Sequence, residues 1–204
     1  MILYIAPATI AVAAAVALEE AGLPYEARRL EFRASEQRGP DYLALNPKGR
    51  VPLLIDGELR LTETGAILEY IHARAPEAGL MPEGAEAQAR IREALHYFAA
   101  TMHVAHAHKL RGTRWADRDE SLADMRAKVP QTMGDCAAHV EAHILTGPFV
   151  LGDRLSIADA HLFAITCWLP GDGVDITAYP KLAHFHETME ARPSVQAVRA
   201  AGFC

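Results

Sequence analysis

Two stretches of the chain combine residue types that can hold charged groups of a small molecule. Glu63 and Thr64 begin a predicted helix, where unpaired backbone N–H groups and a hydroxyl can bind an anion and a carboxylate can bind an ammonium. Thr9 begins an earlier predicted helix, and its hydroxyl and the amides after it can stabilise a second anion. The same residue types also cap helices without binding anything, so a purely structural role stays open for both stretches.

Three histidines, His103, His106 and His108, lie close together in the second half of the chain. Positions 106 and 108 cannot share a helix face, and neither an acid nor a cysteine completes a ligand set, so we expect no metal there. Ordinary polar or core side chains explain them in a chain with ten histidines.

The elements that must position the first two stretches form an α/β pattern over residues 1–76. An apolar run predicts a strand at 2–5, and an alanine-rich segment predicts a helix at 9–20. A second strand at 25–32 would be parallel to the first, because a helix lies between them. Thr9 is expected to cap the first helix.

A hairpin and a helix complete this predicted domain. Val51-Pro52 opens an apolar run that ends at Asp56-Gly57, a dipeptide typical of tight turns, so the third and fourth strands should be antiparallel. The helix that begins near Thr64 should stop before Pro76. The order is βαβ, then ββα, which gives a mixed four-stranded sheet.

The rest of the chain is predicted to be helical. Residues 77–84, rich in proline and glycine, are expected to link the first domain to an all-α domain over 85–204. Ser156 and Asp159 form a variant of the capping box at the start of a nearly all-apolar helix, so we assign them to folding.

Composition excludes several classes of partner. With 204 residues, 50% of them hydrophobic, the chain can bury a sizeable core, and its net charge of −6 without basic runs argues against nucleic acid or an anionic membrane. The longest apolar stretch, Ile10–Leu18, is far shorter than the about 20 residues that span a bilayer. Three widely spaced cysteines and no basic signal region at the start indicate a cytoplasmic protein with free thiols.

The chain resembles the glutathione S-transferase superfamily and, within it, the bacterial beta class. The similarity lies in four stretches that occur in the family's order: Asn46–Pro52, Leu61–Ile71, Phe149–Phe163 and Glu190–Pro193. It covers essentially the whole chain. The resemblance implies a thioredoxin-like first domain, an all-helical second domain, glutathione as co-substrate without a metal, and a homodimer.

It also implies how glutathione would be held. A cis Val51-Pro52 bond would turn the Val51 N–H and C=O toward the cysteinyl part of the ligand. Thr64 would bind the γ-glutamyl carboxylate, and Glu63 the neighbouring ammonium. The catalytic step would then take place beside the first helix.

Other residues receive weaker assignments. Arg33, Lys48 and Arg50 are candidates for the glycyl carboxylate, although a solvated surface cation is the ordinary interpretation of each. His103 corresponds to a histidine in the wall of the beta-class substrate pocket. Thr101 and Val104 depart from the acid and the lysine that are usual nearby, so the substrate side of the pocket is expected to differ.

The residue expected to activate the thiol is missing. The superfamily uses a Tyr, Ser or Cys near the start of the first helix, and the beta class a Cys, but Ile10 and Ala11 stand there. A free thiol titrates at about 8.5, and lowering that pKa by two units takes about 2.7 kcal/mol, which one or two charge-assisted hydrogen bonds supply. The Thr9 hydroxyl and the Ile10 backbone N–H are the candidates.

Three functions remain open from the sequence. The first is a transferase that conjugates glutathione to a small hydrophobic electrophile bound between the domains. The second is a glutathione-binding protein without catalytic activity, suggested by Ile10 and Ala11. The third is a glutathione-dependent disulfide reductase or isomerase.

Overall fold

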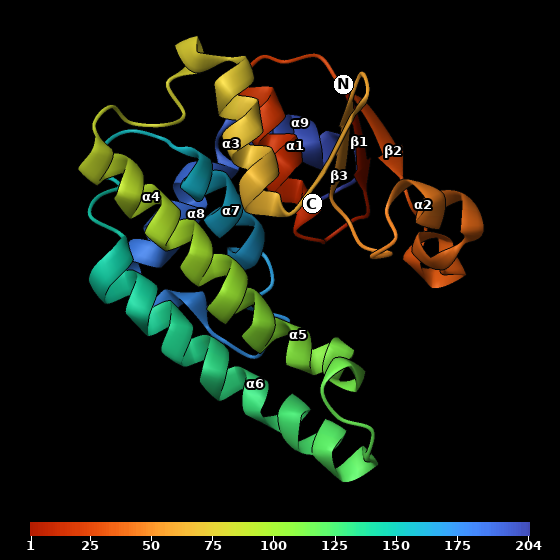
Figure 1. The fold of residues 1–204 in the computed structure, drawn as a ribbon. Helices are drawn as coiled ribbons and strands as arrows, with labels where there is room; N and C mark the ends of the chain where they lie inside the picture. The colour runs from red at the N-terminus through yellow and green to blue at the C-terminus, as the bar shows by residue number, and fades with distance from the viewer.

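A four-stranded mixed sheet forms one end of the molecule (Figure 1). Its order is β2-β1-β3-β4, with β1 and β2 parallel and the other two pairs antiparallel, which confirms the predicted sheet. The computed structural model describes all residues, 1–204. The strand bounds are β1 Ile2–Ile5, β2 Glu26–Arg29, β3 Leu53–Asp56 and β4 Leu59–Thr62.

The second strand is shorter than the predicted 25–32. All four residues of β2 are exposed, as expected of an edge strand. Leu30 and Phe32 leave the sheet and pack with Tyr4, Tyr42 and Leu53 in a small separate hydrophobic cluster. The apolar character that suggested a longer strand therefore serves this cluster.

The first helix, α1 (Ala11–Glu20), lies at the centre of the molecule. Every side chain from Ala11 to Leu18 is buried. It packs against α3 (Thr64–Arg74), α7 (Ile157–Thr166) and α9 (Pro193–Ala200) as well as the sheet. Alanine suits such a helix because its small side chain lets neighbours approach closely from all sides.

The connection between β2 and β3 contains only short helical segments. These are η1 (Phe32–Ala34), η2 (Glu36–Arg38) and α2 (Pro40–Leu45). In Figure 1 they project from the sheet on the side away from α4. The chain then enters β3 through a cis Val51-Pro52 bond, which confirms the expected geometry.

Helices account for most of the chain from residue 85 onward. Residues 85–111 form two α-helices joined by one π-helical turn, and α6 continues through Pro130. The bounds are α4 Ala85–Tyr97, η4 Phe98–Met102, α5 His103–Arg111, η5 Gly112–Arg114, α6 Asp119–His139, η6 Val140–Ile144, η7 Ile176–Ala178 and α8 Pro180–Glu190; η3 (Pro76–Ala78) precedes them. No helix combines the length and the apolar character needed to cross a bilayer.

The capping box at the start of α7 forms as predicted. The Asp159 carboxylate accepts hydrogen bonds from the Ser156 backbone N–H at 2.7 Å and from the Val150 N–H at 2.8 Å. Burial raises the pKa of Asp159 to about 6, although these hydrogen bonds favour the charged form. These contacts hold the start of a buried helix and do not reach the cavity described below.

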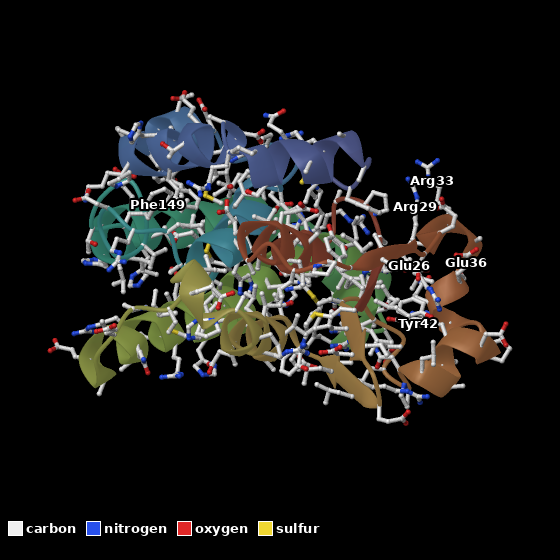
Figure 2. All side chains as sticks on the ribbon, turned by 90° about the horizontal axis from the view of Figure 1, so that it is seen from above. Glu26, Arg29, Arg33, Glu36, Tyr42 and Phe149 are labelled. Carbon is white, nitrogen blue, oxygen red and sulfur yellow. The ribbon has the colours of Figure 1, made fainter.

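The hydrophobic core does not divide at the linker. One cluster includes Leu3 and Val16 from the first part of the chain and Phe98, Phe163 and Phe185 from the helical part. Figure 2 shows the helical segments lying directly against the sheet-bearing part. The two parts are therefore held rigidly enough to share a cavity at their junction.

Candidate active site

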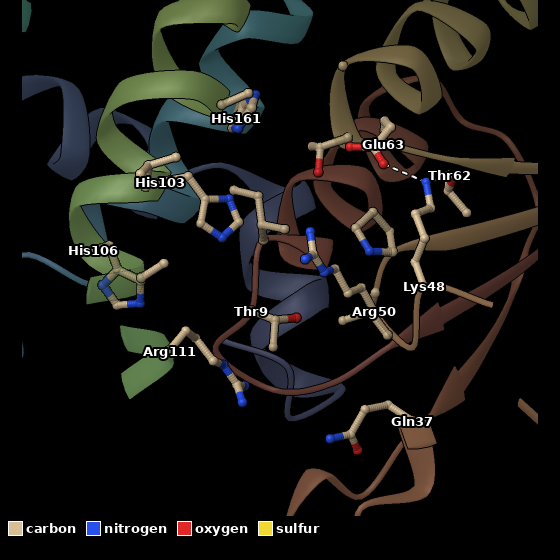
Figure 3. Close-up of a pocket in the computed structure, with 18 of the residues that line it drawn as sticks. Thr9, Gln37, Lys48, Arg50, Thr62, Glu63, His103, His106, Arg111 and His161 are labelled. Carbon is tan, nitrogen blue, oxygen red and sulfur yellow. Dashed lines mark hydrogen bonds and ion pairs between the residues drawn. The ribbon is translucent and has the colours of Figure 1, made fainter. Parts of the chain in front are cut away.

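A large cavity of about 1260 Å³ opens between the sheet-bearing part and helices α4 and α5. Its walls include the loop before α1, the segment before β3 and the start of α3 (Figure 3). Two helix N-termini, those of α1 and α3, thus face the same space. Each presents partial positive charge to whatever binds there.

The N-terminus of α3 carries no side-chain cap. Glu63 occupies the N-cap position, but its carboxylate accepts no hydrogen bond from the helix, so capping does not explain this residue. The first helical bond runs from the Ile67 N–H to the Glu63 carbonyl at 3.0 Å. The N–H groups of Thr64, Gly65 and Ala66 and the Thr64 hydroxyl have no partner within the chain, so they are free for an anion.

The backbone of Glu63 adopts an unusual conformation. Its φ of 72° lies in the left-handed region, which costs a non-glycine residue roughly 1–2 kcal/mol. Strain of this kind gathers at functional sites. Here it places the Glu63 carboxylate beside the uncapped start of α3.

Lys48 lies against Glu63. Its Nζ is 2.5 Å from Glu63 Oε1 and donates a hydrogen bond to Thr62 Oγ1 at 2.5 Å (Figure 3). The ion pair is exposed, so it contributes little stability and can open when a ligand competes for either charge.

Val51 presents free backbone groups to the cavity. Neither its N–H nor its C=O makes a hydrogen bond within the chain, and both adjoin the cis bond to Pro52. The segment is anchored one residue earlier, where the Arg50 carbonyl accepts hydrogen bonds from Tyr42 Oη at 2.6 Å and Asn46 Nδ2 at 2.7 Å. Asn46 and Tyr42, both buried, therefore fix the edge that Val51 offers.

The start of α1 corrects the predicted cap. Ile10, not Thr9, is the N-cap residue, and no side chain caps the helix. Thr9 Oγ1 instead donates a hydrogen bond to the Ala6 carbonyl at 2.6 Å. Because a hydroxyl has a single proton to donate, this bond leaves Thr9 none for a thiolate.

Three amides at this terminus are unpaired. The N–H groups of Thr9, Ile10 and Ala11 have no acceptor within the chain. Ala8, which precedes them, has a φ of 54°, and its backbone is held on both sides: its N–H donates to the Phe203 carbonyl, and its C=O accepts from Trp168 Nε1 at 3.0 Å. The C-terminal part of the chain thus fixes the loop that presents these amides.

The helical wall of the cavity contains uncharged histidines. Burial, with smaller effects of nearby His106 and arginines, lowers the pKa of His103 to about 4. His161 is fully buried, neither of its ring nitrogens has a hydrogen-bond partner, and burial lowers its pKa to about 3. Figure 3 shows both beside the cavity on α5 and α7.

His106 connects this wall to the loop before α1. Its Nδ1 is 2.7 Å from an oxygen of buried Asp172, and its ring stacks on Trp168 with centroids 4.2 Å apart. Trp168 in turn donates to Ala8. His106 is therefore a structural part of the wall.

The side chains best placed to share a metal lie elsewhere. Potential ligand atoms of Cys167, His186 and Glu190 lie within 4.8 Å of one another. Arg199 pairs with the Glu190 carboxylate, and Thr166 is hydrogen-bonded to His186, so protein groups already engage two of the three.

The comparisons with known proteins agree with this geometry. Residues 1–73 match the glutathione S-transferase N-terminal domain, and residues 107–201 match a glutathione S-transferase C-terminal domain. The chain belongs to the glutathione S-transferase family. It is 31% identical to glutathione S-transferase GST-4.5 of Xanthomonas campestris pv. campestris over 198 residues, which cover 97% of this chain and 96% of that protein.

Solved structures of this family superpose over the full chain. A Sulfitobacter glutathione transferase homologue with bound glutathione is 54% identical, with a TM-score of 0.98 and coverage of 100% of this chain and 98% of the other. A beta-class glutathione S-transferase of Sphingomonas chungbukensis is 29% identical, with a TM-score of 0.86 and full coverage of both chains. The predicted family and fold are thereby confirmed, as is the likeness to the beta class.

The glutathione S-transferase cavity brings together most of the residues selected from the sequence. Thr9, Ile10, Lys48, Arg50, Val51, Pro52, Glu63, Thr64 and His103 all line it. Arg33 does not: it is exposed and lies outside the lining.

Sequence reasoning missed several residues that line the cavity. Gln37 is buried with an unpartnered Oε1, His161 is buried and unpaired, and Arg38, Arg111 and Arg114 add charge. They come from separate segments that only folding brings together. The one local signal was the spacing of Arg111 and Arg114, which puts both on one side of a helical turn.

Proposed function

We propose that this glutathione S-transferase conjugates the glutathione thiolate to a small hydrophobic electrophile held against α5. The observation that carries the proposal is the pair of uncapped helix N-termini, α1 and α3, that face one cavity. Glutathione carries two carboxylates, an ammonium and a thiol, and one terminus suits a carboxylate while the other suits the thiolate.

The α3 side would bind the peptide part. The γ-glutamyl carboxylate would accept from the Thr64 hydroxyl and the amides behind it, and the ammonium would face Glu63. The free Val51 N–H and C=O would pair with the cysteinyl backbone, as a strand edge pairs with an extended peptide. Lys48, released from Glu63, would meet the glycyl carboxylate with Arg50.

The α1 side would activate the thiol. A thiolate there would accept from the Ile10 N–H and its neighbours, with the helix dipole adding to the stabilisation. Hydrogen bonds to a charged group are worth about 1.5–3 kcal/mol each, so one or two of them lower a thiol pKa from about 8.5 to about 6.5. In this proposal Thr9 positions the loop through Ala6 and does not touch the sulfur.

The electrophile would lie between the thiolate and the helical wall. Val104, Leu110 and Trp115 supply apolar surface there, and His103 stays uncharged beside it. The thiolate forms a bond to the electrophilic carbon while the leaving group departs with the electron pair of the broken bond.

Three measurements test this function. Calorimetric titration with glutathione at millimolar concentration should show binding, and its absence would exclude every glutathione-dependent activity. Conjugation of chlorodinitrobenzene should then exceed the buffer rate. Binding without conjugation would favour the non-catalytic alternative, and reduction of a small disulfide with glutathione as sole reductant would favour the reductase.

Cytoplasmic localisation and assembly as a homodimer are also part of the proposal. The family resemblance supports the dimer, and the free thiols of Cys136, Cys167 and Cys204 suit a reducing compartment. Light scattering on the purified protein would measure the assembly: a mass of about 44 kDa, twice the 22.2 kDa of the chain, supports it.

A further inference from the structure

The charges that line the cavity do not balance. Six cationic side chains line it, Arg38, Lys48, Arg50, Arg92, Arg111 and Arg114, but only two acids do, Glu63 and Glu69. Both acids are paired within the chain, Glu63 with Lys48 and Glu69 with Arg92. Four arginines therefore face the cavity without a carboxylate partner.

Two of these arginines stand on the wall opposite the glutathione-binding residues. Arg111 ends α5 and Arg114 ends η5, whereas Glu63, Thr64 and Val51 lie on the sheet-bearing part. Figure 3 shows Arg111 on the α5 side of Thr9, and Arg50 and Lys48 on the other side. The two carboxylates of glutathione are accounted for by the α3 terminus and by Lys48 with Arg50, so Arg111 and Arg114 have no evident role in binding it.

The surroundings of these two side chains hold positive charge in place. The Arg111 guanidinium lies over the Phe32 ring, 5.8 Å from its centroid, which orients it without neutralising it. Burial and the neighbouring guanidinium groups of Arg50, Arg111 and Arg38 lower the pKa of Arg114, so the arginines repel one another. An anion bound among them would relieve that repulsion.

A second observation concerns a buried polar side chain in the same wall. His161 lines the same cavity, is fully buried, and has no hydrogen-bond partner for either ring nitrogen. A buried polar group without a partner costs about 1–3 kcal/mol, and contact with a ligand atom removes that cost. A pocket built for purely hydrophobic molecules would not require such a residue.

We propose that the second substrate of this enzyme is an electrophile that carries a carboxylate, bound by Arg111 and Arg114. A planar carboxylate matches the fork of guanidinium donors, and two such groups hold it at a fixed orientation. The electrophilic carbon then faces the thiolate at α1. The inference rests on the proposed function and names its substrate class.

The experiment compares two electrophiles that differ only in this group, chlorodinitrobenzene and chlorodinitrobenzoate. In both, the glutathione sulfur bonds to the carbon that bears chlorine, and chloride leaves with the bonding electrons. Calorimetry on the two purified glutathione conjugates gives their Kd values, and initial rates give the ratio of kcat/KM for the two electrophiles.

The wild-type protein should bind the carboxylated conjugate about tenfold or more tightly than the neutral one, as expected for a charge-assisted contact. In Arg111→Gln/Arg114→Gln this preference should fall to about twofold or less, for the Kd ratio and the kcat/KM ratio alike. Arg118→Gln is the matched control, because Arg118 is exposed, has no ion pair and does not line the cavity. It should keep the full preference.

Four results would overturn the inference. The first is a wild-type preference near one, and the second is a preference that survives in the double variant. The third is a control variant, Arg118→Gln, that loses the preference as fully as the double variant does. The fourth is a double variant whose affinity for glutathione falls as much as its affinity for the carboxylated conjugate. Conjugates that bind with the expected preference while neither electrophile reacts would support the anion site and reject the transferase. Failure of glutathione to bind would reject both the carboxylate-bearing substrate and the proposed transferase function.

Discussion

The starts of α1 and α3 face the same cavity but differ in what surrounds them. At α3, exposed charged side chains and a free hydroxyl stand beside unpaired amides, and a strained Glu63 backbone brings its carboxylate close. At α1, the amides are also unpaired, but the nearest hydroxyl is turned to Ala6 and the facing histidine, His103, is half-buried and uncharged. The α3 terminus therefore offers both side chains and backbone N–H groups to a ligand, whereas the α1 terminus offers backbone N–H groups alone.

This difference explains how a glutathione site can survive without the usual catalytic residue. A carboxylate is always charged near neutral pH, so its site gains from charged and hydroxyl side chains. A thiol must first be ionised, and backbone amides at a helix start favour the ionised form without themselves titrating. The comparison leads to four predictions, ordered from the largest expected effect to the smallest.

Acid should destabilise the fold through His161, which lies on α7, the helix packed against α1. The pKa of His161 is about 3 in the folded protein and near 6.5 in an unfolded chain, so the unfolded state binds more protons below about pH 6.5. The free energy of unfolding should therefore fall by about 2 kcal/mol between pH 7 and pH 5 because of this histidine.

Urea unfolding at pH 7 and at pH 5 measures this fall in the free energy of unfolding. In His161→Phe the fall in the free energy of unfolding should be about 2 kcal/mol smaller than in the wild type, because no imidazole remains to take up a proton. His161→Gln is the matched variant and should give the same reduction. Asp159, whose raised pKa stabilises the fold as pH falls, contributes equally to all three proteins. An undiminished drop in both variants would contradict the assignment.

Removing the Thr64 hydroxyl should weaken glutathione binding. Thr64→Val deletes a donor to the γ-glutamyl carboxylate but leaves the amides, so the Kd for glutathione should rise about tenfold. The thiol pKa of bound glutathione, read from thiolate absorbance, should stay constant because the sulfur lies at the other terminus. Thr62→Val is the control, since its hydroxyl contacts Lys48; an equal loss there would mean that the effect is not specific to α3.

Removing one backbone N–H at α1 should change the thiol pKa of bound glutathione and leave the Kd for glutathione nearly constant. Ile10 has a φ of −61°, which proline accepts, so Ile10→Pro deletes the N–H with little change in backbone conformation. The thiol pKa should rise by about 1 unit, and conjugation at pH 6.5 should fall about fivefold with little change in glutathione affinity. Ile10→Val keeps the amide and should resemble the wild type; a pKa that does not move in Ile10→Pro would place the activating donor elsewhere.

Removing the Thr9 hydroxyl should have the smallest effect on chemistry. Thr9→Val breaks the bond to the Ala6 carbonyl, so the fold should lose about 1 kcal/mol, while the thiol pKa and kcat/KM should change by less than about twofold. Thr9→Ser restores the hydroxyl and should recover the stability. A tenfold loss of rate in Thr9→Val with unchanged stability would show that the hydroxyl reorients to the sulfur.

Much of the fold followed from local sequence patterns. The Asp56-Gly57 turn set the hairpin, Ser156 and Asp159 set the start of α7, and the apolar run at 2–5 set the first strand, because each is decided by residues close in the chain. The cis bond at Pro52 and the glutathione site came from resemblance, since nothing in the dipeptide itself distinguishes cis from trans.

The remainder depended on contacts between distant segments. The sequence placed Thr9 where a cap belongs, but whether its hydroxyl meets a helix amide or the Ala6 carbonyl depends on the loop that Trp168 and Phe203 hold in place. Likewise Arg111, Arg114 and His161 come from three separate elements, α5, η5 and α7, and only packing brings them to one cavity. By itself the sequence determined most of the elements, because local propensity and short motifs specify them. Only the tertiary structure decided which groups line the cavity and which of them stay unpaired there, because burial and pairing depend on every element that packs around them.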